Sequence, residues 1–134
     1  MSREDVEVVR QLNQAFNKGT REWAEFYDPE AELRLPPGLP AGIDPVVNGR
    51  DPIRRAAALW TETVFEYRWD IERLIDAGDC IVGLFYFRSR IKPGDEWLNP
   101  PLGAVFYLRE GRIVRLLSFF SWEEALQAAG VRER

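Results

Sequence analysis

Apolar side chains recur at helical spacing in the first part of the chain. Between residues 3 and 17 they fall three or four residues apart, at Val6, Val9, Leu12 and Phe16. This spacing predicts an amphipathic helix over 3–17. Ser2 is the expected N-cap. Gly19 is the expected end of the helix, because glycine readily adopts the left-handed conformation found there.

A shorter stretch with large aromatic residues follows. The residues from Trp23 to Tyr27 predict a short helix over about 20–27, with Thr20 as its cap. The Asp-Pro pair after it should end the helix, because a residue before proline is pushed out of the helical region. Residues 31–35 then alternate between apolar and polar, which predicts a strand.

A long irregular loop and a third helix come next. Residues 36–48 hold four prolines and two glycines, and loops of this length often form the lid or rim of a binding site. Asp51 followed by proline predicts the start of a helix, with Asp51 as the N-cap. The buried face of this helix is expected to carry Ile53, Ala57, Trp60 and Val64.

The second half of the chain has the pattern of consecutive strands. Strands are predicted over 65–75, 80–92, 97–109 and 112–121, followed by a short helix over 122–129. Ser121 is the expected cap of that last helix and Gly130 its end. The pattern predicts one α+β domain over residues 1–134, with three helices before an antiparallel meander of strands and a short helix at the end.

Composition argues against several classes of protein, among them nucleic-acid-binding and membrane-spanning proteins. The 134 residues suit one domain, and the net charge of −4 with scattered Lys and Arg argues against nucleic-acid binding. A single cysteine, Cys80, allows no internal disulfide. No apolar run is long enough to span a membrane, and no apolar signal region follows the first residues. We therefore expect a cytoplasmic protein without a nucleic-acid or membrane partner.

The chain contains no histidine. This excludes Ser-His-Asp and Cys-His catalysis and any imidazole metal ligand. With a single cysteine as well, the sequence indicates no metal site, and we expect no cofactor.

Four segments resemble a known family in order and spacing. They are AFNKGTREWAEFYDPEAEL, NGRDPIRR, LIDAGDCIV and VFYLREGRIVRLLSFFSWEEALQAAGV. Together they resemble the nuclear transport factor 2-like superfamily, in its SnoaL-like (polyketide cyclase-like) group. The resemblance implies a strongly curved sheet wrapped around the helices, with a cone-shaped cavity between them. Members include ketosteroid isomerases, epoxide hydrolases, cyclases and binding domains, so the fold does not determine the function.

The positions that carry chemistry in these relatives are apolar or small here. The closing segment is most similar to limonene-type epoxide hydrolases, whose Arg and two Asp positions correspond to Phe85, Phe87 and Ser118. The base, Tyr and Asp positions of ketosteroid isomerases correspond to Leu35, Leu12 and Ala104. Apart from the Ser118 hydroxyl, none of these side chains can donate or accept a proton. We expect neither activity.

A binding pocket is the leading hypothesis. Its expected lining is Trp23, Tyr27, Trp60, Trp69, Phe85, Phe87, Phe106, Ser118 and Phe120. An aromatic lining suits a small, flat hydrophobic molecule. Two alternatives remain: an isomerase, cyclase or hydrolase that uses an acid–base pair involving Tyr27 or Tyr67, and an accessory module whose aromatic residues simply fill the core.

The strand over 80–92 is apolar on both faces, which predicts a homodimer. If its alternate residues face the cavity, Leu84 and Tyr86 point outward, and Leu117 and Phe119 do the same on the last strand. Soluble monomers rarely expose an apolar patch of this size. A two-fold contact between sheets would cover it.

Overall fold

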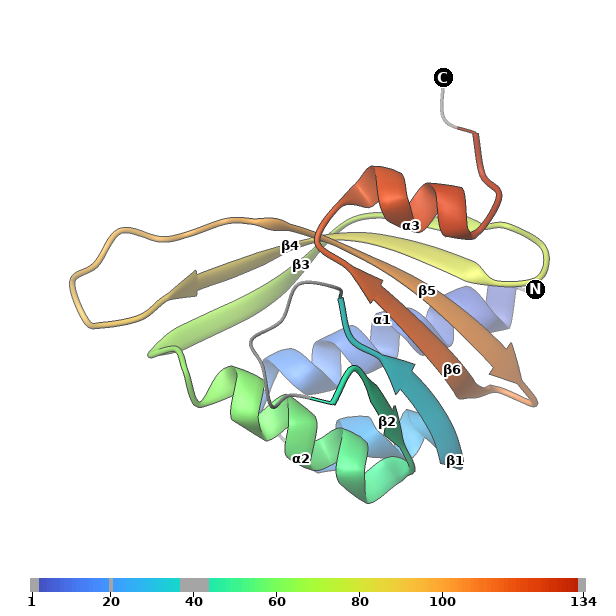
Figure 1. Ribbon diagram of the computed structural model, residues 1–134, viewed down its shortest axis with the longest axis horizontal. Coiled ribbons are helices and arrows are strands. Elements are labelled where there is room, and N and C mark those ends of the chain that lie inside the picture. Colours follow the sequence, from blue (N-terminus) through green and yellow to red (C-terminus); the bar gives the residue numbers. More distant parts are fainter. Residues whose placement is uncertain (1–2, 20, 37–43, 133–134) are drawn as a thin grey trace.

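The computed structural model describes residues 3–19, 21–36 and 44–132. One curved, six-stranded sheet organises this part of the chain. Helices α1 (Arg3–Asn17), η1 (Arg21–Phe26) and α2 (Arg50–Thr61) lie on one side of the sheet, and α3 (Trp122–Ala128) lies on the other (Figure 1). The sheet does not close on itself, and the α+β cone expected from the sequence is confirmed.

The sheet is mixed, not wholly antiparallel as expected. Its strand order is β2 (Val46–Asn48), β1 (Tyr27–Arg34), β6 (Arg112–Phe119), β5 (Pro101–Arg109), β4 (Ile81–Arg90) and β3 (Glu66–Asp76). The pairing of β1 with β6 is parallel. The β1–β2 hairpin precedes the meander and adds to the free edge of β6. Local alternation of apolar residues does not reveal the direction of such a long-range pairing.

Two helix boundaries differ from those expected. The short second helix is a 3-10 turn that ends at Phe26, and Tyr27 begins β1. Helix α2 begins at Arg50 after Gly49, with no side-chain cap, and Asp51 instead pairs with Arg54 at 2.9 Å. Gly49 has a φ of 97°, which glycine tolerates, so the chain can enter the helix one residue before the aspartate.

The other end of α2 and the loop before it also differ. The helix ends at Thr61, so Val64 lies beyond it. Strand β2 lies inside the proline-rich stretch that was expected to be irregular, where Val46–Asn48 pairs with β1. The rest of that loop, residues 37–43, lies outside the described residues, as do the expected caps Ser2 and Thr20.

The two strands nearest the C-terminus are shorter than expected. Strand β5 starts at Pro101, and before it only Leu98 makes a bridge, to Ser89. The prolines at 100 and 101 lack the N–H that a continuous ladder needs. Ser121 caps α3 by accepting a hydrogen bond from the Glu124 N–H at 3.3 Å, as expected.

Strand β3 is an edge strand tied to α1. The Trp69 N–H donates to Asn17 Oδ1 at 2.8 Å, and the Asn17 amide donates back to the Trp69 carbonyl at 2.9 Å. A register shift between Ile71 and Arg73 moves the inward-facing position from Ile71 to Leu74. Such a bulge bends the strand, and here it curves β3 around the helices.

Helix α3 covers the outer face of the sheet. Its Ala125 packs over Gly103, where a side-chain methyl group would lie 2.6 Å from the Ala125 Cβ. Leu84 is buried beneath this helix, and Tyr86 packs edge-on against Trp122. The patch that predicted a homodimer is therefore covered by the chain itself, because α3 folds back over β4, β5 and β6.

Candidate functional site

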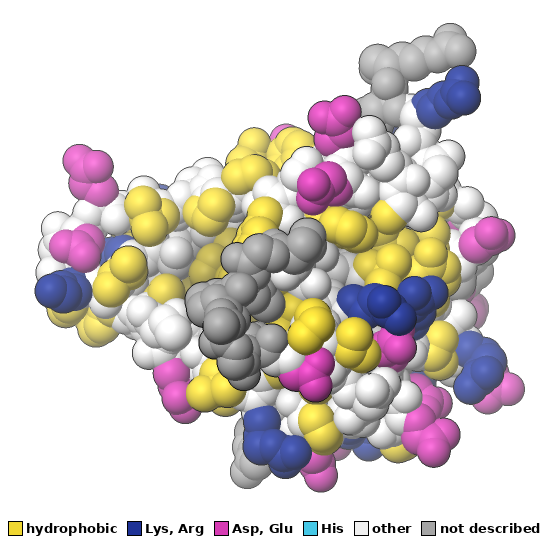
Figure 2. All heavy atoms as spheres, in the orientation of Figure 1, with side chains coloured by type: hydrophobic (Ala, Val, Ile, Leu, Met, Phe, Trp, Pro, Cys, Tyr) yellow, Lys and Arg dark blue, Asp and Glu magenta, His cyan; other side chains and the backbone are white. Residues whose placement is uncertain are grey.

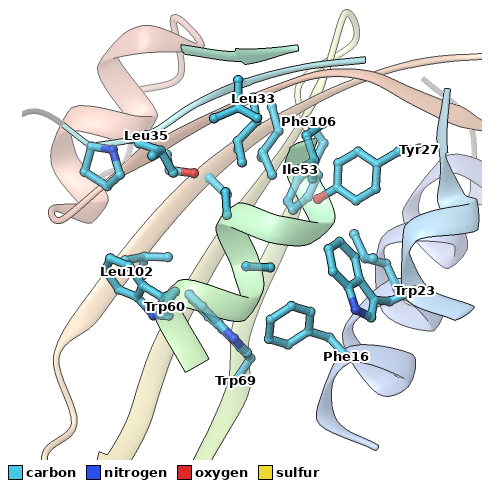
Figure 3. A pocket seen from close by; sticks show the side chains of 18 of the residues that line it. Phe16, Trp23, Tyr27, Leu33, Leu35, Ile53, Trp60, Trp69, Leu102 and Phe106 are labelled. Atoms are coloured by element: carbon cyan, nitrogen blue, oxygen red, sulfur yellow. The ribbon is translucent and has the colours of Figure 1, made fainter. Parts of the chain in front are cut away.

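A cavity of about 640 Å³ lies between the sheet and the three N-terminal helices. Tyr27, Trp23 and Ile53 lie at its closed end, and all three are buried (Figure 3). Leu59, which is 69% exposed, lines the other end and marks the mouth. The volume falls in the range of small-molecule sites.

Aromatic rings form much of the wall, and they hold one another in place. Phe16 contacts Trp23 and Trp69 edge-on, with ring centroids 5.2 and 6.0 Å apart. Trp69 meets Phe85 at 6.1 Å with nearly perpendicular planes. Edge-on contacts of this kind fix ring orientation. Together the rings form a firm apolar wall drawn from α1, η1, β3 and β4.

The structure brings most of the expected pocket residues together. Those that line the cavity are Trp23, Tyr27, Trp60, Trp69, Phe85, Phe106 and Ser118. Phe87 does not line it, because its ring packs against Trp60, Tyr67 and Trp69 instead. Phe120 does not line it either. It follows the end of β6, is 43% exposed and stacks on Trp60 outside the wall.

Aliphatic residues complete the lining, and most of them could not be assigned to the cavity from the sequence alone. They include Val9, Leu33, Pro36, Val47, Leu59, Leu102 and Leu116. Ile53 was expected on the buried face of α2, and it is 1% exposed at the closed end. Val9 was expected on the apolar stripe of α1. The strand residues Leu33, Val47, Leu102 and Leu116 depend on how β1, β2, β5 and β6 pair, which local patterning does not determine.

Most of the positions expected to correspond to catalytic residues of epoxide hydrolases and ketosteroid isomerases line this cavity, and Phe87 does not. Leu12, Leu35, Ala104, Phe85 and Ser118 all line it. Such side chains provide no proton donor or acceptor pair at those positions, apart from the serine hydroxyl. The described wall therefore offers apolar contact where those relatives are expected to hold acid–base groups.

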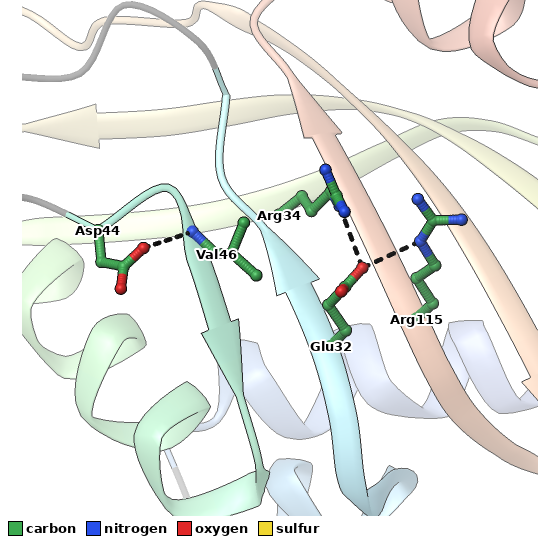
Figure 4. Close-up of polar contacts among 5 residues, drawn as sticks. All are labelled: Glu32, Arg34, Asp44, Val46 and Arg115. Carbon is green, nitrogen blue, oxygen red and sulfur yellow. Dashed lines mark hydrogen bonds and ion pairs between the residues drawn. The ribbon is translucent and has the colours of Figure 1, made fainter.

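Charged groups line the cavity only toward its exposed end, among the described residues. They are Asp44 and Arg55, and both are exposed. Asp44 Oδ1 accepts a hydrogen bond from the Val46 N–H at 3.0 Å, so this carboxylate stabilises the start of β2 (Figure 4).

Tyr27 is the polar residue at the closed end. It is 5% exposed, and its hydroxyl points into the cavity (Figure 3). Burial raises the pKa of the Tyr27 hydroxyl far above its usual value, so the group stays protonated. The Arg50 guanidinium donates to the Tyr27 backbone carbonyl at 2.6 and 3.2 Å, which fixes the start of β1 against α2.

The other expected tyrosine has a structural role. The Tyr67 hydroxyl donates to the Phe16 carbonyl at 3.3 Å, and Tyr67 is absent from the cavity lining. Burial raises the pKa of the Tyr67 hydroxyl as well. Tyr67 thus joins β3 to the end of α1 and lies outside the cavity.

The remaining polar groups of the wall are engaged or covered. Asn13 donates to the Trp69 carbonyl at 3.2 Å. The indole N–H groups of Trp60 and Trp69 have no hydrogen-bond partner among the described residues, and neighbouring atoms cover both nitrogens. A molecule in the cavity would therefore meet the faces and edges of these rings, not their N–H groups.

The outer surface of β1 and β6 carries a separate charged cluster. Glu32 lies between Arg34 and Arg115, with each Arg Nε 3.1 Å from its Oε2 (Figure 4). The Arg34 guanidinium is the largest cause of a lowered Glu32 pKa, and Arg115 adds to it. On the face that Figure 2 shows, basic side chains alternate with acidic and hydrophobic ones and form no continuous basic patch.

Within the described part of the chain, no group of three or more Cys, Asp or Glu residues is arranged to hold a metal ion. None of the described helices is long and apolar enough to cross a membrane.

Comparison with known proteins gives the same fold. A protein of unknown function with the nuclear transport factor 2-like fold, from Burkholderia pseudomallei, superposes with a TM-score of 0.78 at 21% identity, covering 95% of this chain and 97% of that one. TerC, co-crystallised with polyporic acid, gives 0.77 at 16%, covering 95% and 98%. A ketosteroid isomerase-like protein from Catenulispora acidiphila, in complex with trimethylamine, gives 0.72 at 16%, covering 94% of each chain.

Curated proteins gave no significant match to the chain. The family model of the SnoaL-like domain, in contrast, matches residues 9–116. This span runs from within α1 to within β6 and includes all of β1 to β5. The chain therefore belongs to the family of SnoaL-like domains.

Proposed function

We propose that this protein binds a small, largely apolar molecule in the cavity between the sheet and the helices. The observation that carries the proposal is an open cavity of about 640 Å³ with an aromatic and aliphatic lining. Protein interiors are otherwise packed to the density of organic crystals, so a void of this size needs an occupant or a use.

Two structural neighbours support a ligand-binding role for this fold. TerC was co-crystallised with polyporic acid, and the Catenulispora protein was obtained with trimethylamine. The two ligands differ in size and charge, so neither identifies the ligand of this chain. The ligand is therefore inferred from this chain's own wall, whose aromatic and aliphatic lining favours a flat apolar body.

A role in acid–base catalysis receives less support from the same wall. Asp44 is the described carboxylate on the lining, and it is exposed and bonded to the backbone of β2. Tyr67 lies outside the cavity. An accessory module with a filled interior receives less support as well, because the cavity between the sheet and the helices is open.

Thermal shift with flat apolar compounds tests the proposal. A ligand that binds only the folded state raises the free energy of unfolding by mass action, and the melting temperature rises with it. At a ligand concentration of a hundred times the Kd, the added free energy is about 2.7 kcal/mol. We expect fluorene or a similar ring compound to raise the melting temperature and to change tryptophan fluorescence, because Trp23, Trp60 and Trp69 line the cavity.

A filled variant provides the control. Ala104 lines the cavity from β5, and Ala104→Leu places a larger apolar side chain in the open space. We expect this variant to fold and to lose the response to fluorene. A response of equal size in the variant, or none in the natural protein, would contradict binding in this cavity.

The homodimer remains a prediction. The surface on which it was based is covered by α3, so a dimer needs another contact. Exposed apolar residues remain at Phe65, Ile91, Trp97 and Leu98, near the extension between β4 and β5. Light scattering at micromolar concentration tests it, and a monomeric mass would exclude it.

A further inference from the structure

The closed end of the cavity holds the Tyr27 hydroxyl, a polar group that the described part of the fold does not use. The Tyr27 hydroxyl points into the cavity (Figure 3), and no described residue forms a hydrogen bond with it. Its oxygen is not among the polar atoms that neighbouring atoms cover, so it is open to the cavity. The groups around it are apolar: Ile53, Phe106 and the ring of Trp23, whose centroid lies 5.9 Å from that of Tyr27. Polar groups inside a protein are almost always hydrogen-bonded, to protein or to an ordered molecule, so this hydroxyl is expected to bond with what the cavity holds.

A phenylalanine would fill nearly the same volume and would need no hydrogen-bond partner. Leaving a buried donor unsatisfied costs free energy, whereas an apolar group of the same shape does not. The wall is apolar at the neighbouring positions Val9, Leu12 and Leu33. The Tyr27 hydroxyl has a function if a molecule bound in the cavity accepts a hydrogen bond from it.

Given the proposed binding function, on which this inference rests, we propose that the Tyr27 hydroxyl anchors a neutral oxygen acceptor of the ligand at the closed end. The ligand class is a flat apolar molecule that carries a carbonyl group on its leading edge, such as an aryl ketone or a quinone. The apolar body fills the space between Trp69, Phe85 and Ile53, and the carbonyl oxygen points toward Tyr27.

The surroundings select a neutral acceptor over a carboxylate. The charged residues on the described lining, Asp44 and Arg55, lie toward the mouth, and the Arg50 guanidinium near Tyr27 is bonded to its backbone carbonyl. A carboxylate at the closed end would be buried without a cation, which is very costly. The raised pKa of Tyr27 keeps the hydroxyl a donor throughout the ordinary pH range.

The test uses two probes of nearly the same shape, 9-fluorenone and fluorene, which differ in the ketone oxygen. Their Kd values are measured with the natural protein, with Tyr27→Phe and with Tyr67→Phe. We expect Tyr27→Phe to weaken 9-fluorenone roughly 3–10-fold, the worth of one neutral hydrogen bond, and to leave fluorene within about twofold. Tyr67→Phe is the matched control, because its hydroxyl bonds the Phe16 carbonyl and does not face the cavity, so both probes should bind it as before.

Two further readouts separate a ligand contact from a structural role. The carbonyl stretch of bound 9-fluorenone should lie at lower frequency in the natural protein than in Tyr27→Phe. The melting temperature of unliganded Tyr27→Phe should be unchanged or higher, whereas Tyr67→Phe, which loses a hydrogen bond, should melt lower.

The outcomes distinguish this inference from the proposed function. If both probes bind and Tyr27→Phe changes their Kd values equally or not at all, the anchor is excluded and the binding function stands. A clear loss of stability in unliganded Tyr27→Phe would also overturn it, because the hydroxyl would then have a structural partner. If neither probe binds the natural protein, the binding function fails and the anchor fails with it.

Discussion

The two faces of the sheet are packed in opposite ways, and consecutive residues of β5 show the contrast. Gly103 faces outward, where an added methyl group would lie 2.6 Å from the Ala125 Cβ and 2.9 Å from the Ser121 carbonyl oxygen. Ala104 faces inward and lines a cavity of about 640 Å³. The same strand therefore supports close packing on one side and an open space on the other.

This difference shows that the cavity is not a result of loose packing in general. Close packing is also found on the inner face, at Gly83, because a Cβ there would overlap the Phe85 ring. The missing side chain lets that ring lie close to β4 and leaves the space in front of it free. Interiors pack densely wherever the chain permits, so an open region beside such close contacts is a feature of this wall.

The largest effect should come from truncating matched leucines on the two faces. Leu84 is buried under α3, and Leu102 lines the cavity. Leu84→Ala should lower the free energy of unfolding by about 2–5 kcal/mol, because it creates a void in a packed layer. Leu102→Ala should cost clearly less, since part of its side chain already borders open space. Urea denaturation of both variants measures the difference, and equal costs would mean that the inner face is packed as well.

A smaller effect is expected from adding one methyl group under α3. Gly103→Ala should destabilise the protein by about 1–3 kcal/mol, because the new Cβ meets Ala125 and the backbone at Ser121. Alanine would otherwise be favoured over glycine in a strand, by roughly 0.5–1 kcal/mol. The sign of the change in melting temperature is therefore informative. A stabilised Gly103→Ala would show that α3 does not lie against β5.

The sequence predicted the inward and outward sides of β4 correctly but not what covers the outward side. Phe85 lines the cavity and Leu84 faces away from it, as the alternation indicated. The cover is α3, which depends on the contact between Ala125 and Gly103, residues far apart in the chain. An alternating pattern reports burial, and it does not distinguish a partner chain from the chain's own helix.

Lining residues were predicted correctly where the periodicity of a single helix or strand places them. They were missed where their position depends on the packing of two elements. Trp60 and Trp69 follow from the periodicity of α2 and β3. Val47 belongs to a three-residue strand inside a proline-rich stretch, which has no pattern of its own. Phe87 was placed in the cavity by alternation, but the rings of Trp60 and Trp69 pack against it.

The smallest effect on stability is expected from the charged cluster around Glu32. This cluster lies on the outer surface of β1 and β6, at some distance from α3. Arg34 and then Arg115 lower the Glu32 pKa below its ordinary value of 4.5. A lowered pKa in the folded state adds stability above the unfolded-state pKa, and this is lost as the pH falls through the folded-state value. Glu32 is half-buried at the surface and its two arginine partners are more exposed, so solvent screening keeps the gain small.

Comparison with Glu32→Gln isolates this contribution. The natural protein should melt slightly higher than the variant at pH 7, and the gap should narrow as the pH falls below about 4.5. A gap that persists at pH 3 would show that the carboxylate charge is not its source.

Xenon uptake tests most directly whether the inner face is open and apolar. Xenon enters dry apolar cavities without needing any particular functional group. A crystal structure of the protein under xenon pressure should show xenon between the sheet and α2, next to Trp69, Phe85 and Ile53, and none between α3 and β5. If the space instead holds collapsed side chains and no xenon, the cavity is absent and the contrast between the two faces is wrong.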